Sequence, residues 1–298
     1  ATVDENPAAA VAPHAISWWA RVRFQQGDAP QAAQLYRRLL NEYPGSELTP
    51  QAWKDLGLVY KSSGQLDDAV EALTHVDPTF ESWPKVQAEA ADILLAAGRA
   101  ERIDEVLRLD EALRRAAKAG DDESVAELHY VRGRIAREQG DRVSEIDHFS
   151  QVLLISTNPD LATFSRFFRG IAQYQAGSAL DATGDSLAAE PQFEASIADL
   201  QAVLDTGTAD EIRLVAFRTR GVALTRLGRS EEAVRTYEGL IAAASSPLER
   251  AEFQLMLMEL YYDLGRLDDT KVVARQLIGG TFEEDAAAEF AIRDRAYF

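Results

Sequence analysis

Glycine recurs along this 298-residue chain in one context, after an apolar helical stretch and before a short polar pair and a second apolar stretch. Seven glycines share this context, at intervals of 37, 34, 42, 44, 44 and 37 residues: Gly27, Gly64, Gly98, Gly140, Gly184, Gly228 and Gly265. Glycine after a helix readily adopts the left-handed conformation that ends it, and a recurring period of roughly 20–50 residues is typical of repeat proteins. The sequence therefore predicts seven stacked helix–turn–helix units.

Four further positions in these units are marked by residue size or charge. Seven residues before the turn glycine, six units have a small residue: Ala20, Gly57, Ala91, Gly133, Gly177 and Gly221. Five residues after it, four have alanine: Ala32, Ala69, Ala189 and Ala233. A larger residue follows on the second helix: Tyr36, Leu73, Leu107, Phe149, Phe193 and Tyr237. Aspartates that can cap the second helix follow five turns: Asp28, Asp67, Asp141, Asp185 and Asp268. Small residues at the first two positions would let the paired helices approach closely.

The pattern resembles the tetratricopeptide repeat. The second unit has the spacing of that family in Trp53, Leu56, Gly57, Tyr60, Gly64 and Ala69, and the sixth in Phe217, Gly221, Leu224, Gly228, Ala233 and Tyr237. The first unit adds Tyr36 and Pro44, whereas Ile103, Glu145 and Thr270 stand where the family prefers alanine. The resemblance implies an all-α fold, a right-handed α-solenoid of about seven repeats, with a concave groove lined mainly by the first helix of each unit.

The resemblance covers roughly residues 14–278, and the ends of the chain differ from it. Residues 1–13 are rich in alanine and proline and are predicted to form a flexible N-terminal leader. Residues 279–298 are predicted to form a C-terminal capping helix that covers the open end with Phe282, Phe290 and Ile292. The long middle intervals predict longer helices there, or a shifted superhelix.

Composition narrows the possible partners. The chain has 31 basic and 49 acidic residues, a net charge of −18, so phosphate backbones and anionic lipids are poor partners for the molecule as a whole. No apolar run approaches the roughly 20 residues of a membrane-spanning helix. With no cysteine, disulfides, thiolate zinc sites and cysteine nucleophiles are excluded.

No motif for catalysis, metal or cofactor binding is present. The four histidines lack the spacing of a metal site, although His129 and His148 lie on the two helices of one unit and can face each other. Every glycine-rich spot is a helix junction, so no phosphate-binding loop is predicted. We therefore expect no enzymatic activity and no cofactor.

Arginines suggest one binding surface. Arg134, Arg137, Arg218 and Arg226 fall at phases that the resemblance places in the groove, and Arg166 and Arg169 precede the first helix of the fifth unit. Together they predict a positive stripe that binds carboxylates of a protein or peptide partner. The alternative is local pairing, since Arg134–Glu138 and Arg137–Asp141 have helical spacing. The stripe does not reproduce the lysine/asparagine clamp of chaperone-binding relatives.

Aromatic residues suggest a second surface. Trp18 and Phe24 face the groove in the phase of the family, whereas Trp19 and Trp53 fall at core positions. Exposed aromatics often anchor a partner, but residues 7–13 packing onto Trp18 and Phe24 is an equal alternative. A line along the inner face continues through Tyr130, Tyr174, Leu255 and Tyr262.

These features predict a non-enzymatic protein-interaction scaffold. The segment Tyr43-Pro44-Gly45-Ser46 resembles repeats of periplasmic envelope-assembly proteins of bacteria, which implies a cell-envelope complex and an extracytoplasmic location. The start at Ala1 fits removal of a secretion signal, or equally a trimmed chain. The alternative function is a cytoplasmic regulatory or sensor module that binds a peptide or small ligand.

Overall fold

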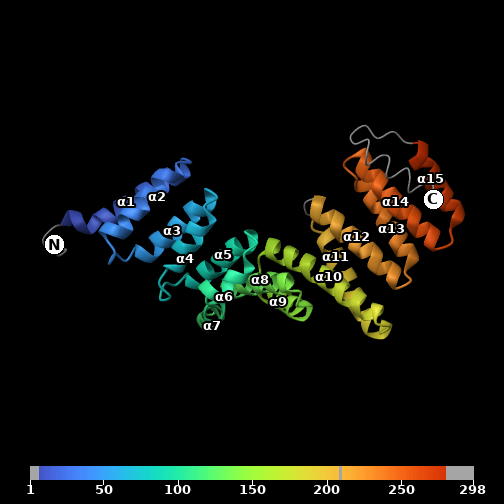
Figure 1. The fold of residues 1–298 in the computed structure, drawn as a ribbon, viewed down its shortest axis with the longest axis horizontal. Coiled ribbons are helices and arrows are strands. Elements are labelled where there is room, and N and C mark those ends of the chain that lie inside the picture. The colour runs from blue at the N-terminus through green and yellow to red at the C-terminus, as the bar shows by residue number, and fades with distance from the viewer. Residues whose placement is uncertain (1–6, 208–209, 280–298) are drawn as a thin grey trace. The chain divides into compact units, whose positions relative to one another are not determined.

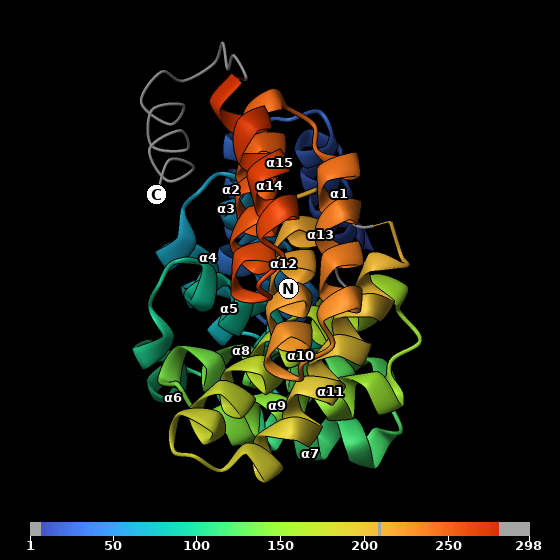
Figure 2. The same cartoon turned by 90° about the vertical axis from the view of Figure 1, so that its right-hand side faces the viewer.

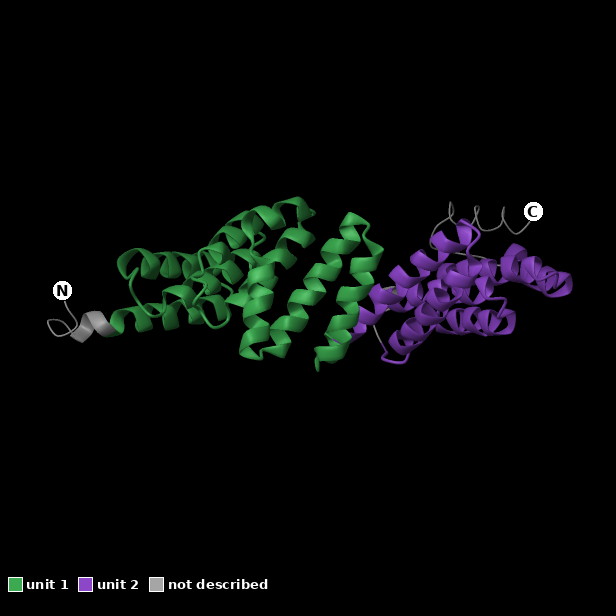
Figure 3. Ribbon diagram, turned by 90° about the horizontal axis from the view of Figure 1, so that it is seen from below, with its two compact units in different colours: residues 1–161 green, residues 162–298 purple. Residues whose placement is uncertain are grey.

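The structure is a computed structural model that describes residues 7–207 and 210–279 (Figure 1). Across these residues every regular element is a helix and no strand occurs, so the predicted all-α class is confirmed. The chain divides into two compact units, Ala1–Leu161 and Ala162–Phe298 (Figure 3), and each is described by itself.

Unit 1 consists of helical hairpins that pack in chain order. Its helices are α1 (Pro7–Gln25), α2 (Ala29–Glu42), α3 (Thr49–Ser62), α4 (Leu66–Thr74), α5 (Trp83–Ala96), the 3₁₀ helix η1 (Ala100–Arg102), α6 (Ile103–Val106), α7 (Leu109–Ala119), α8 (Asp122–Gln139) and α9 (Arg142–Ile155). The second helix of one hairpin packs against the first helix of the next, as α2 does on α3 and α4 on α5. This stacking is the predicted repeat architecture.

Unit 2 follows the same plan with longer helices at its start. Its helices are α10 (Pro159–Ala182), whose first turn still belongs to unit 1, α11 (Ser186–Leu204), α12 (Asp210–Arg226), α13 (Ser230–Ala243), α14 (Pro247–Asp263) and α15 (Leu267–Gly279). Helices α12 to α15 lie side by side, each packed on its neighbour in sequence (Figure 2).

The turns form as predicted. All seven turn glycines have positive φ, from 67° at Gly98 to 85° at Gly184, a region that L side chains rarely enter. Asp28, Asp141 and Asp185 each accept a hydrogen bond from the backbone N–H three residues further on. Each of these caps satisfies a helix donor that would otherwise lack an intrahelical partner.

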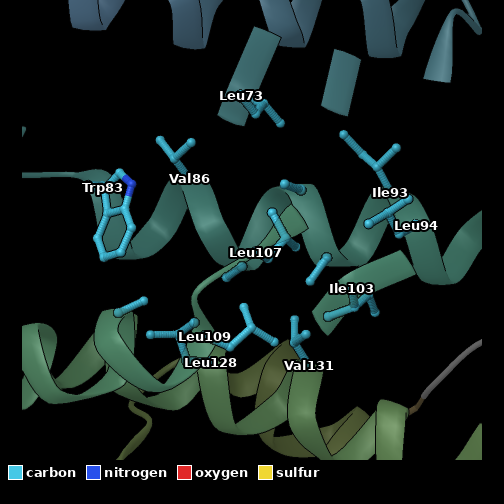
Figure 4. Packing of buried hydrophobic residues seen from close by; sticks show 14 of the residues in the cluster. Leu73, Trp83, Val86, Ile93, Leu94, Ile103, Leu107, Leu109, Leu128 and Val131 are labelled. Atoms are coloured by element: carbon cyan, nitrogen blue, oxygen red, sulfur yellow. The ribbon is translucent and has the colours of Figure 1, made fainter. Parts of the chain in front are cut away.

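The small residues before the turn lie where the paired helices meet. A Cβ built on the glycine would fall within 3.0 Å of the large residue on the second helix in four hairpins: Gly57 on Leu73, Gly133 on Phe149, Gly177 on Phe193, and Gly221 on Tyr237. Neighbouring hairpins then share apolar cores, as where α4, α5, α7 and α8 enclose Trp83, Val86 and Leu128 (Figure 4). The predicted close approach of paired helices is confirmed.

Three features differ from the sequence-based expectation. The 42-residue interval contains an extra helix, α7, which ends at Gly120 with φ of 71°, whereas the 44-residue intervals contain long helices as predicted, such as the 24 residues of α10. The second helix of the third hairpin is short, only η1 and α6. Helix α1 begins at Pro7, inside the stretch predicted as a leader. The capping helix expected over 279–298 lies outside the described residues except for Gly279.

Candidate partner-binding groove

The predicted arginines occupy two separate settings. Arg134 and Arg137 lie on α8 in unit 1, and Arg218 and Arg226 lie on α12 in unit 2. In unit 2 the first helices of three hairpins border a groove of about 660 Å³, called the unit 2 groove below. Its lining residues are Asp181 of α10, Arg218, Val222, Thr225 and Arg226 of α12, Tyr237 of α13, and Met256, Glu259, Leu260 and Asp263 of α14.

The floor of the unit 2 groove is built by the repeat itself. Because Gly221 has no side chain, α12 approaches α13 until the Tyr237 ring lies against the backbone of α12. Tyr237 is buried beside Leu260. Tyr174 packs on Phe193 with the two rings tilted and their centroids 6.0 Å apart. Burial raises the pKa of the Tyr237 phenol to about 12, against the opposing charge of Arg218. The hydroxyl therefore stays protonated and can donate a hydrogen bond.

The rim of this groove carries both signs of charge. Arg218 is exposed and, within residues 7–207 and 210–279, forms no ion pair of 4.0 Å or less. Arg226 reaches Asp181 at 3.6 Å across the mouth of the groove. Glu259 and Asp263, one helical turn apart on α14, supply carboxylates on the opposite wall. This acidic wall was missed in the sequence, where only the arginines were singled out.

In unit 1 the corresponding helices are joined by ion pairs. Arg134 donates to Asp92 of α5, which also lies 3.9 Å from Lys61 of α3, while Lys85 of α5 pairs with Glu127 of α8 at 2.9 Å. We call these five residues the unit 1 charge ladder. Arg134 therefore pairs with Asp92 on a neighbouring helix and not with Glu138, the partner named in the alternative of local pairing.

A smaller hollow of about 230 Å³ lies along this ladder, between α5 and α8. Tyr130 lines it, with the Arg134 guanidinium 5.9 Å from its ring centroid and Phe149 packed edge-on. Burial raises the pKa of the Tyr130 phenol. The cations around this hollow already face carboxylates of the same unit, in contrast to Arg218.

Arg137 is half-buried and interacts electrostatically with Glu145 of the same hairpin. Glu145 stands at the position of the family alanine, is 1% exposed, and accepts a hydrogen bond from Arg142 at 2.7 Å. Burial raises the pKa of the Glu145 carboxyl, while Arg142 and then Arg137 act in the opposite direction. Arg137 thus helps to hold a buried carboxyl inside the fourth hairpin.

The prediction that Arg166 and Arg169 precede the first helix of the fifth unit is wrong, because both residues lie within α10. Arg169 donates from Nε and Nη2 to both carboxylate oxygens of Asp199 on α11, each at 2.7 Å. This bidentate pair is largely buried and joins the two helices of the fifth hairpin. It is a structural contact inside unit 2.

The predicted aromatic line is not one surface. Tyr262 is exposed on α14, but Leu255 on the same helix is buried, so its predicted place on the inner face is wrong. Tyr130 and Tyr174 are half-buried against the cores. Phe24 packs partly against the core of the first hairpin, and Trp18 is exposed. Trp19 is 49% exposed, which corrects its predicted core position.

His129 and His148 face each other as expected from their places in the repeat. Their Nδ1 atoms lie 3.2 Å apart, so one ring donates and the other accepts when both are neutral. Burial lowers the pKa of both imidazoles; the charge of Arg132 also acts in this direction on both. Across the described residues no cluster of three or more His, Asp or Glu side chains could hold a metal, and none of the described helices could span a bilayer.

A chain of stacked helical hairpins whose first helices border a groove is a helical-repeat protein. Two stretches of the chain, residues 19–76 and 218–269, match the tetratricopeptide repeat model. The chain therefore carries tetratricopeptide repeats in both units. No curated protein sequence is significantly similar to it.

Solved structures with the same fold are known from several organisms. A tetratricopeptide repeat protein from Parabacteroides merdae has a TM-score of 0.54 at 10% identity, over 96% of this chain and 99% of its own. The C-terminal part of a repeat protein from Cytophaga hutchinsonii has 0.56 at 15%, over 91% and 96%. A signal-transduction ATPase with a tetratricopeptide repeat sensor, from Pyrococcus horikoshii, has 0.55 at 14%, over 94% of this chain and 43% of its own. At such identities the likeness shows the fold alone.

Proposed function

We propose that this protein is a non-enzymatic scaffold that holds a protein partner, and that the unit 2 groove binds an extended segment of that partner. The observation that carries the proposal is Arg218. Among the residues that the structure describes, Arg218 has no ion-pair partner, and it borders a groove whose floor is formed by Tyr237 and whose opposite wall carries carboxylates. A partner segment with a carboxylate for Arg218 and a basic or amide side chain for Asp263 would contact both walls.

The first experiment identifies what enters the groove. A photo-crosslinking amino acid at Val222, inside the groove, should capture the partner in cells of the source organism. The same amino acid at Val143, an exposed residue of α9 in unit 1, is the control. Capture at Val222 and not at Val143 supports the groove, whereas equal capture at both positions contradicts it.

The second experiment measures the charge contribution with the captured partner. Arg218→Glu should weaken binding and remove much of its salt dependence, because the partner's carboxylate then meets a repelling charge. Arg235→Glu, an equal charge change at an exposed arginine of α13 outside the groove lining, should leave both nearly unchanged. Unaltered melting of both variants shows that the fold is intact. Equal binding by the two variants would refute the role of Arg218.

We further propose that the scaffold works in a bacterial cell-envelope complex. Support comes from the segment Tyr43-Pro44-Gly45-Ser46 after α2, which resembles the repeats of periplasmic envelope-assembly proteins. Fractionation of source cells tests this location directly. Recovery of the protein entirely with cytoplasmic markers would refute it.

A cytoplasmic sensor module is the second candidate. It is favoured by the fold likeness to the signal-transduction ATPase, whose tetratricopeptide repeats form a sensor. Under this alternative the groove would receive a peptide or small ligand, and the protein would copurify with a regulatory partner from the cytoplasm. The same fractionation therefore separates the two candidates.

A further inference from the structure

Helices α8 and α9 pack closely at a place that carries two histidines. Gly133 of α8 has no side chain, and a Cβ built there would lie 2.8 Å from Cε1 of Phe149 on α9. His129 lies about one helical turn before Gly133, and His148 is the chain neighbour of Phe149. The contact that lets the two helices approach therefore also sets the distance between the two imidazole rings.

The two rings present nitrogen atoms to each other. Their Nδ1 atoms are 3.2 Å apart and their ring centroids 5.3 Å apart, so these nitrogens lie on the facing edges of the rings. This separation is at the long end of ordinary hydrogen bonds. It is close to the roughly 3.3 Å between two nitrogens that bind one tetrahedral zinc ion at about 2.0–2.1 Å each. The pair therefore has the spacing of a two-histidine chelate.

The surroundings of the pair leave room for other ligands. Both imidazoles are half-buried, so an ion between them would still be in contact with solvent. Across the described residues no third His, Asp or Glu completes a group that could hold a metal. Water would therefore take the remaining coordination positions, whereas structural zinc sites ordinarily have four protein ligands. This arrangement predicts an exchangeable ion.

The charged side chains near the pair are of both signs. Arg132 and Asp147 act electrostatically on both histidines, and Asp141 acts on His148. Arg132 donates a hydrogen bond to Asp110 of α7, and this carboxylate offsets the repulsion between Arg132 and a cation at the pair. The local charges therefore permit a divalent cation to bind.

We propose that His129 and His148 together bind a divalent transition-metal ion of the zinc and copper class through their Nδ1 atoms. Imidazole nitrogen suits these ions, whereas Mg²⁺ and Ca²⁺ prefer oxygen ligands. Both Nδ1 atoms must be unprotonated to bind, so the ring that donates the hydrogen bond would carry its proton on Nε2 instead. Two metal–nitrogen bonds would then replace the hydrogen bond between the rings. The ion would join α8 to α9 within unit 1, and the site is independent of the unit 2 groove.

Calorimetric titration of the full chain with Zn²⁺, after removal of metals with a chelator, tests the site. His129→Gln and His148→Gln should each weaken the tightest zinc site roughly tenfold or more, because each removes one of two linked ligands. The matched control is His14→Gln with His75→Gln, which removes the other two histidines and should leave this site intact. Equal zinc affinity of this control and of the His129→Gln, His148→Gln double variant would assign the ion to surface carboxylates and overturn the proposal. Absence of zinc binding by the wild type would also overturn it.

Two further measurements do not depend on comparing affinities. The urea midpoint of the wild type should rise with added Zn²⁺ and not with Mg²⁺, because an ion that joins two helices binds the folded chain. Cu²⁺ is the spectroscopic probe, and its electron paramagnetic resonance spectrum in the wild type should show coupling to two imidazole nitrogens. This spectrum decides the question even where a histidine variant fails to fold. Coupling to a single nitrogen would show that the rings do not chelate one ion and would overturn the proposal.

Discussion

Gly221→Ala tests the contact on which the repeat architecture and the unit 2 groove both depend. A Cβ at Gly221 would lie 2.9 Å from Cζ of Tyr237 and 3.1 Å from its hydroxyl oxygen, closer than ordinary van der Waals contact. Tyr237 is buried among the residues of three hairpins, so its ring cannot yield without moving neighbours. Gly239, on the paired helix α13, is a matched control, because a Cβ there would meet its nearest neighbour, Phe217 Cε1, at 3.6 Å.

The two substitutions share one effect and differ in another. Each replaces a helical glycine with alanine, which stabilises a helix by about 0.5–1 kcal/mol. At Gly239 this is the main effect, so we expect a gain of that size. At Gly221 overpacking adds a cost of about 1–3 kcal/mol, which gives a net change from nearly zero to a loss of about 2.5 kcal/mol. The expected difference between the variants is the overpacking cost alone.

Urea unfolding followed by helical circular dichroism measures both free energies of unfolding. Because repeat arrays can unfold in parts, native-state hydrogen exchange should show the loss in α12, α13 and α14. Tyr237→Leu in the Gly221→Ala background removes the clashing ring atoms, so the two substitutions should be coupled. Equal stabilisation by Gly221→Ala and Gly239→Ala would show that the helices do not meet at Gly221.

Two further predictions concern buried polar pairs. The pKa of His129 and of His148 is lowered in the folded state, so the unfolded chain binds more protons as the pH falls, and stability should be lost below the ordinary histidine pKa of about 6.5. The urea midpoint of the wild type should therefore fall between about pH 7 and pH 5.5. Replacing both histidines with glutamine should reduce that fall, and an unchanged fall would contradict the assignment. Arg169→Met leaves the Asp199 carboxylate buried without its bidentate partner and should cost about 3–5 kcal/mol, against little for the exposed Arg235→Met, and Asp199→Leu in the same chain should restore much of the loss.

The sequence contained the fold because the repeat is specified locally. A turn needs positive φ, which glycine adopts at no steric cost, and a close helix pair needs a small residue opposite a large one; both requirements lie within one unit of sequence. Helix α7 was missed because it adds a single helix between hairpins, whereas the repeat pattern counts pairs. Its Gly120 and capping Asp121 have the same turn chemistry, and that was the available signal.

The site was less visible because it depends on stacking. Arg134 pairs with Asp92, 42 positions earlier in the sequence, a contact that helical spacing cannot reveal. Trp19 was placed in the core because its repeat position is buried when a hairpin precedes it. Glu259 and Asp263 of α14 lie across the unit 2 groove from the arginines of α12. The packing of α13 against both helices sets the distance between these two walls.

Stacking and binding draw on the same residues, and this competition indicates where selectivity lies. A cation on the first helix of a hairpin can join its neighbour, as Arg134 does in the unit 1 charge ladder, or remain available to a partner, as Arg218 does. Removing a ladder cation leaves Asp92 facing one cation fewer and loosens α5 from α8, so it alters stability. Removing Arg218 breaks no ion pair within the described residues and adds only the small cost of a surface change. Substitutions that separate binding from folding are therefore expected at the unit 2 groove, and the ladder positions should tolerate few changes whatever partner is bound.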